Sequence, residues 1–152
     1  MKLENNGRVG YASYITLYMK DCIFCKIALK EIPNYTVYED NHALAFLDIN
    51  PRAKGHTVVI PKVHAETIFD LNEEIAKDLL PAVQKATEKI ERVLQPDGYN
   101  IGWNHGEAGG QVVPHLHIHI MPRWDGDGGT NMHGIVNAPG EMDVADVAKL
   151  FV

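Results

Sequence analysis

The stretch His115-Leu116-His117-Ile118-His119-Ile120-Met121 determines how this sequence is interpreted. Side chains along a β-strand point alternately to opposite faces. The three histidines of this stretch therefore share one face, about 7 Å apart along the strand, while the leucine and the isoleucines share the other. We expect the apolar face to pack in the core and the imidazole face to line a functional site.

Three imidazoles on one face point to one of two chemistries. Neutral imidazole is a common metal ligand, but three side chains from one straight strand do not easily reach a single ion. An imidazole nitrogen can also attack phosphorus to give a covalent phosphoimidazole, which water then hydrolyses, while its neighbours bind phosphate oxygens or protonate the leaving group. A single histidine is explained equally well as a hydrogen-bonded structural residue, but protein stability does not require three in a row.

The segment before the histidines favours phosphate as the ligand. Residues 104–111 are rich in glycine, and such loops can turn their backbone N–H groups toward an anion. Asn104 and Gln111 would add neutral hydrogen-bond donors, although turn formation explains both residues as well.

The rest of the pattern predicts an α+β domain with mostly antiparallel strands and with helices packed on one side of the sheet. Helical spacing predicts a short helix over Ile23–Lys30 and a long helix that begins after Asn72, contains a kink at Pro81 and ends before Pro96. The apolar stripe of the long helix consists of Ile75, Leu79, Leu80, Val83, Ala86, Ile90, Val93 and Leu94. The expected strands are Thr36–Glu39, Ala43–Leu47, His56–Ile60, Tyr99–Trp103 and Val112–Met121, and a last helix is expected over Asp143–Phe151.

Length and charge limit the classes of protein to which this chain can belong. A chain of 152 residues predicts one domain, here residues 20–124, with an extension of uncertain status at 1–19 and a tail at 125–152. The net charge of −6 argues against a nucleic-acid partner, because nucleic-acid binding needs a broad basic surface. There is no apolar run of about 20 residues and no apolar signal-peptide core, so we expect a cytoplasmic protein without a membrane partner.

These residues resemble a known family. His115–Met121 fits the H-φ-H-φ-H-φ-φ signature of the histidine-triad (HIT) proteins, where φ is an apolar residue. Further blocks similar to those of the family follow the family's order: Cys22–Ile27, Ala45–Ile49, Gly55–His64 and Gly109–His115. The resemblance extends from about Cys22 to Arg123 and is strongest to the bacterial type with a C-x-x-C pair.

The resemblance implies a five-stranded antiparallel sheet with two helices. It also implies a homodimer whose two sheets form one continuous ten-stranded sheet, built across the long helix and the strand near Tyr99–Trp103. The implied substrate is a purine nucleotide, an AMP or GMP derivative such as a nucleoside phosphoramidate, a dinucleoside polyphosphate or an aminoacyl-adenylate. In this scheme His117 attacks the α-phosphate, His119 binds that phosphate and assists the leaving group, and His56 lies behind them.

The resemblance also assigns the residues that contact the nucleotide. Asn104, Gly110 and Gln111 would lie at the phosphate and Asp48 at the ribose, although Asp48 is also explained as a cap at the end of a strand. The base pocket would consist of Ile23, Phe24, Ile27, Phe46 and Ile49, which the sequence alone would assign to the core. Val112 stands where the phosphoramidase branch usually carries a hydroxyl near the leaving group, and this departure argues against phosphoramidase specificity.

Cys22 and Cys25 are spaced C-x-x-C, which indicates a redox pair, half of a metal site or two ordinary buried thiols. A closed zinc site needs four ligands. The resemblance implies that His64 and His115 complete it, while the alternatives are His42, His105 and His133. Such a zinc would be structural, and the proposed chemistry requires no catalytic metal. Two other functions remain open: a zinc-dependent hydrolase that uses the histidine row as ligands, and a non-catalytic nucleotide sensor or scaffold.

Overall fold

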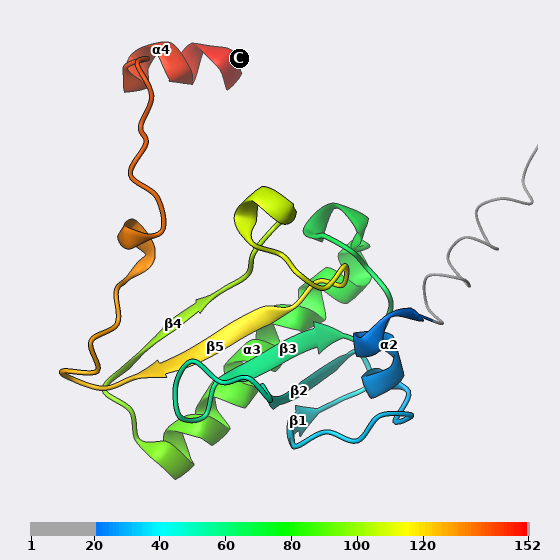
Figure 1. Cartoon of the computed structure of the whole chain (residues 1–152). Coiled ribbons are helices and arrows are strands. Elements are labelled where there is room, and N and C mark those ends of the chain that lie inside the picture. Colours follow the sequence, from blue (N-terminus) through cyan, green and yellow to red (C-terminus); the bar gives the residue numbers. More distant parts are fainter. Residues whose placement is uncertain (1–20, 152) are drawn as a thin grey trace, which may run out of the picture.

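A computed structural model of the chain describes residues 21–151, so the expected extension 1–19 lies outside the described residues. Five strands form one antiparallel sheet in the order β1-β2-β3-β5-β4 (Figure 1). Their bounds are β1 Thr36–Glu39, β2 Ala43–Leu47, β3 Thr57–Pro61, β4 Gly98–Gly102 and β5 Ile118–Arg123. The predicted α+β fold with a five-stranded antiparallel sheet is confirmed.

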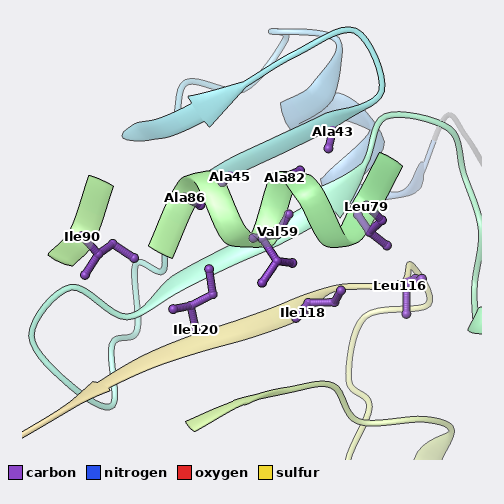
Figure 2. Close-up of a cluster of buried hydrophobic side chains, with 11 residues drawn as sticks. Ala43, Ala45, Val59, Leu79, Ala82, Ala86, Ile90, Leu116, Ile118 and Ile120 are labelled. Atoms are coloured by element: carbon purple, nitrogen blue, oxygen red, sulfur yellow. The ribbon is translucent and has the colours of Figure 1, made fainter. Parts of the chain in front are cut away.

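The long helix α3, Glu73–Leu94, covers one face of the sheet. It begins at Asn72, whose side chain accepts a hydrogen bond from the Ile75 backbone N–H, and it continues through Pro81. Figure 2 shows small and branched side chains filling the space between helix and sheet: Ala43, Ala45, Val59, Ile118 and Ile120 from the strands, and Leu79, Ala82, Ala86 and Ile90 from the helix. The alanines let the helix approach the strands closely.

Two residues of the predicted apolar stripe lie outside this core. Leu80 is 72% exposed and Val93 is 77% exposed. Helical spacing places Leu80 at the edge of the buried stripe, whereas Val93, three residues after Ile90, lies on the buried side but in the last turn of the helix. The predicted apolar stripe therefore includes two residues, Leu80 and Val93, that are not buried within this chain.

The short helix α2, Ile23–Ala28, packs on the opposite face, so the expectation that the helices share one side was also wrong. Its Ile27 joins Leu44, Phe46, Val58 and Ile60 in a second core. Strands β2 and β3 are thus buried on both faces, which is why their sequences are continuous apolar runs rather than alternating ones.

The histidine strand is shorter than predicted. The ladder between β3 and β5 begins at Ile118, and His115 and His117 precede it, with His115 at the end of a bend over residues 113–115. Pro61 at the end of β3 offers no N–H to continue the ladder, and the Leu116 N–H bonds to the carbonyl of Ala65 instead. The expected alternation nevertheless holds, because Leu116, Ile118 and Ile120 are buried in the α3 core.

After β5 the chain forms an exposed tail. All residues from Asp125 to Phe151 are exposed, and three short helical segments interrupt the tail, the first two being η3 Met132–Gly134 and α4 Val144–Ala148. The predicted terminal helix is present as α4 followed by the 3-10 turn η4, Lys149–Phe151, and it lies apart from the sheet (Figure 1). Among residues 21–151, no helix has the length and apolar character needed to cross a bilayer.

Candidate active site and metal centre

The floor of the site is a row of residues paired across the sheet, on the face that also carries α2. Phe46 of β2 pairs with Val58 of β3, Val58 pairs with His119 of β5, and His119 pairs with Gly102 of β4. Paired residues in neighbouring strands point to the same face. Because α2 covers only β2 and β3, His119 faces an open cleft at the β5–β4 side of the sheet.

His117 is placed so that one ring nitrogen is fixed and the other is available. Its Nδ1 lies 2.6 Å from the backbone carbonyl oxygen of His115. A carbonyl only accepts, so Nδ1 carries the hydrogen and donates, and in the neutral ring Nε2 keeps its lone pair. The ring lies 5.2 Å from that of Phe24 and 5.0 Å from that of His119, centroid to centroid, and only 8% of the residue is exposed. A held, neutral imidazole with a free Nε2 is the form required of a nucleophile.

His119 has the opposite tautomer, because His56 sets it. The Arg52 backbone N–H donates to His56 Nδ1 at 3.2 Å, so the neutral His56 ring carries its hydrogen on Nε2. This Nε2–H donates to His119 Nδ1 at 2.9 Å, which leaves the His119 hydrogen on Nε2. In the cleft, His117 therefore presents a lone pair on Nε2, and His119 presents an N–H on Nε2.

Burial keeps the rings of His119 and His56 neutral when no ligand is bound. It lowers the pKa of His119 to about 4, with the nearby rings of His117 and His56 acting in the same direction. Burial also lowers the pKa of His56, while the Asp48 carboxylate acts in the opposite direction. The tautomers assigned to His119 and His56 therefore apply at neutral pH.

The cleft has a volume of about 620 Å³ and contains nearly all of the predicted nucleotide-binding residues. Its lining includes His117, His119 and His56 together with Ile23, Phe24, Ile27, Phe46, Asp48, Ile49, Asn104, Gly110 and Val112. Gln111 is not part of the lining. Its side-chain amide donates to the carbonyls of Glu66 and Val113 and accepts from the Gly106 N–H, so it fixes the loop.

The glycine-rich loop ends next to the histidines. Gly106 and Gly110 have φ of 69° and 90°, a left-handed conformation that favours glycine. The Asn104 side-chain amide donates to the Gly110 carbonyl at 3.3 Å. The loop thus brings a side-chain amide and a glycine backbone into the lining of the cleft that also contains His117.

The four predicted metal ligands meet beside the cleft. Cys22 is the N-cap residue of α2, Cys25 lies in its first turn, His64 follows β3, and His115 precedes β5. The Sγ–Nδ1 distances are 3.4 Å for Cys22–His115, 3.3 Å for Cys25–His64 and 3.6 Å for Cys25–His115. Ligands at normal Zn–S and Zn–N lengths on a tetrahedron are about 3.6 Å apart, so this Cys2His2 set suits zinc.

The protonation of these groups also suits a metal ion. His115 donates from Nε2 to the Pro61 carbonyl, which leaves the Nδ1 lone pair directed at the cysteines. Burial lowers the His115 pKa to about 4, so the ring stays neutral. Burial raises the Cys25 pKa to about 12, with Cys22 beside it adding to the rise, so a nearby cation is needed to hold this sulfur as a thiolate.

The alternative ligands lie elsewhere. His42 faces Asp78 at 3.7 Å, His105 packs against the ring of Phe69, and His133 belongs to the exposed tail. A second cluster that could hold a metal, formed by Asp48, His56 and His119, lies within the cleft. Three of its four imidazole nitrogens are already engaged, because His56 uses Nδ1 for Arg52 and Nε2 for His119 Nδ1.

Sequence reasoning missed several residues of the cleft. Met121 also lines it and could have been found, since it follows His119 at the strand period of two. Met132 and Ile135 of the tail line the cleft as well. No periodic pattern in the tail predicted their position.

The HIT domain family matches residues 29–126 of this sequence. The chain belongs to the HIT family. A relative from Schizosaccharomyces pombe named adenosine 5'-monophosphoramidase is 45% identical over 67% of this chain and 74% of its own length. Together with family membership, this relative confirms the prediction of an enzyme of the histidine-triad type.

Two crystal structures of other proteins are similar to this HIT-family chain. A zinc-bound histidine triad family protein from Mycobacterium smegmatis is 37% identical, with a TM-score of 0.68 over 72% of this chain and 80% of that chain. A protein from Streptococcus mutans is 34% identical, with a TM-score of 0.77 over 99% of this chain and 89% of that chain. The second similarity therefore includes the tail.

Proposed function

We propose that this chain hydrolyses or transfers the nucleotidyl group of purine nucleotide conjugates, through a covalent intermediate on His117. The observation that carries the proposal is the complementary pair in the cleft: the free lone pair of His117 Nε2 and the Nε2–H of His119, on rings whose centroids are 5.0 Å apart. A nucleophile and a hydrogen-bond donor on one reacting phosphate are the groups that such a transfer requires.

The nucleotide would lie across the face of the sheet that carries α2. Its base would contact the apolar side chains of α2 and β2, and its ribose hydroxyls the carboxylate of Asp48. Its α-phosphate would reach Asn104 and the Gly110 backbone. The apolar character of the lining around Phe24 and Phe46, which form an edge-to-face pair 5.9 Å apart, supports a flat aromatic base there.

The reaction follows from the tautomers. His117 Nε2 attacks the α-phosphorus, and the bond from phosphorus to the leaving atom breaks as the Nε2–P bond forms. The negative phosphate raises the pKa of His119, so that ring can carry the proton that it delivers to the leaving atom. Water then attacks the phosphorus and breaks the Nε2–P bond, which releases the nucleoside monophosphate and restores His117.

Cys22, Cys25, His64 and His115 would hold a structural zinc ion. All four ligand positions would be filled by protein, so the ion would contribute stability and fix the start of β5 rather than activate water. The zinc-bound relative supports this assignment.

The chain would act as a homodimer with a continuous ten-stranded sheet. Strand β4 is at the sheet edge, and its Ile101 is 40% exposed beside the exposed Leu80 of α3. Apolar side chains gathered at an edge strand support pairing with a second copy. Light scattering after size-exclusion chromatography tests this, with Leu80→Glu expected to yield monomers.

Mass spectrometry of rapidly quenched enzyme tests the mechanism. Incubation with an adenosine phosphoramidate should give an adenylyl adduct on His117. His117→Ala should lose nearly all turnover and bind AMP with little change. His42→Ala is a matched control that should turn over normally, because His42 faces Asp78 and lies outside the cleft lining. Full turnover in His117→Ala would contradict the mechanism, and an intact protein that binds AMP without any turnover would indicate a sensor.

A further inference from the structure

We propose that the tail builds the leaving-group end of the cleft, where Met132 and Ile135 select a leaving group with an apolar body over a polyphosphate. This inference rests on the proposed function. It concerns residues 130–136, which lie beyond the part of the chain that the HIT domain matches.

The order of the strands defines two ends of the cleft. The nucleoside end is formed by β2 and α2, the reactive histidines are on or next to β5, and β4 forms the far edge of the sheet. A substrate whose base lies on β2 and whose α-phosphate lies at His117 therefore extends its remaining group toward β4.

At that far edge the tail supplies a side chain that the sheet lacks. Gly102 of β4 pairs with His119 but has no side chain to continue the row across the sheet. The Met132 Cε lies 3.4 Å from the position that a Cβ on Gly102 would take. Met132 therefore extends this row and stands beside the donor histidine, and Ile135 follows it in the lining.

A set of hydrogen bonds made by the Arg123 side chain, called the Arg123 clamp below, holds the tail against β4 and β5. The Arg123 guanidinium donates to both carboxylate oxygens of Asp127, at 2.6 Å each, and also to the Asn100 side chain and the Thr130 carbonyl. Asp127 in turn accepts from the Trp124 and Gly129 backbone N–H groups. The bidentate pair ties the tail to β4 and β5 immediately before η3, so that Met132 is delivered to Gly102.

The chemistry of this end favours an apolar group. Its side chains are apolar and partly exposed around the cleft: Trp103 44%, Met132 55% and Ile135 69%. Among the described lining residues, Arg52 is the sole lysine or arginine, and its backbone contacts His56 rather than this end. Arg123, which reaches Asn100 at this end, is already paired with both carboxylate oxygens of Asp127 and is not part of the lining, so it offers little to a polyphosphate. The flexible thioether of Met132 and the indole of Trp103 instead suit an aromatic or branched apolar body.

The test compares two phosphoramidates of AMP that differ only in the amine, ammonia and phenethylamine, together with diadenosine tetraphosphate. Wild-type enzyme should show the highest kcat/KM with the phenethylamine compound and the lowest with the tetraphosphate. In Met132→Ser/Ile135→Ser, the phenethylamine-to-ammonia ratio of kcat/KM should fall about tenfold, equivalent to about 1.4 kcal/mol. Asp127→Asn should lower the same ratio by releasing the clamp.

Val144→Ser is the matched control, since this residue is an apolar tail residue that is 86% exposed and lies outside the cleft lining. Its ratio should equal that of wild type. An unchanged ratio in the double variant, with circular dichroism showing an intact fold, overturns the tail assignment alone. A wild-type preference for the tetraphosphate overturns the apolar specificity alone. No turnover of any of the three compounds overturns the proposed function together with this inference.

Discussion

Replacing His56 with alanine should slow adduct formation without removing any group that touches the substrate. In the structure the His56 Nε2–H is the hydrogen-bond donor to His119 Nδ1, at 2.9 Å. Without this donor, the His119 ring can move its hydrogen to Nδ1 and present a lone pair to the phosphate. Only the tautomer with hydrogen on Nε2 assists the leaving group, so the rate should depend on how often that tautomer occurs.

The magnitude follows from the single bond that is lost. A hydrogen bond whose loss leaves a buried partner unsatisfied is worth about 1–3 kcal/mol. Applied to the transition state, this lowers kcat by roughly 5- to 150-fold. KM should change much less, because His56 is 3% exposed and is covered by His119 and Arg52.

A rapid-quench assay separates this effect from misfolding. The burst amplitude of the His117 adduct counts correctly folded sites and should stay near that of wild type, while the burst rate falls. His56→Gln should restore part of the rate, because its amide nitrogen can donate to His119 Nδ1. A burst rate in His56→Ala within twofold of wild type would refute the tautomer argument.

Three further predictions concern the metal, the pH dependence and the core. Elemental analysis of the purified chain should find about one zinc per protomer. Cys25→Ser should lose the zinc and melt at a lower temperature by calorimetry. A metal-free wild type with an unchanged melting temperature would rule out a structural ion. The His119 pKa of about 4 lies below its ordinary 6.5, so the unfolded chain takes up this proton first as the pH falls. The free energy of unfolding, from urea titrations, should therefore decrease between pH 6.5 and 4 by up to about 3 kcal/mol from this residue, and His119→Asn should flatten that part of the profile. Ile120→Ala should cost about 2–5 kcal/mol in the same urea titrations, because Ile120 is fully buried between sheet and α3, whereas Val144→Ala should cost almost nothing.

The histidine stretch could be interpreted from the sequence because its period is short and strict. Alternation alone separated Ile118 and Ile120, which enter the core, from His119, which faces the cleft. The C-x-x-C spacing indicated a metal site, but the choice of His64 and His115 needed the family resemblance, since residues far apart in sequence carry no spacing signal.

The predictions that were wrong or missing concern features set by residues distant in sequence, which no local sequence pattern encodes. The start of β5 is set by Pro61 on the facing strand, and the exposure of Leu80 results from how α3 is rotated over the sheet. The position of α2 could have been inferred, because uninterrupted apolar runs in β2 and β3 indicate burial on both faces. Met132 was unpredictable, because its place depends on the Arg123 clamp and on the missing side chain of Gly102.

The Arg123 clamp holds only the first part of the tail, which contributes Met132 and Ile135 to the cleft lining. The later part, with α4, does not line the cleft. Between η3 and α4 the backbone is exposed and forms neither helix nor strand. A protease cutting in this connection would remove α4 and leave Met132 and Ile135 attached. An affinity tag or fluorophore at the carboxyl end would accordingly sit apart from the sheet (Figure 1), which makes that end the natural attachment point for a reporter on the working enzyme.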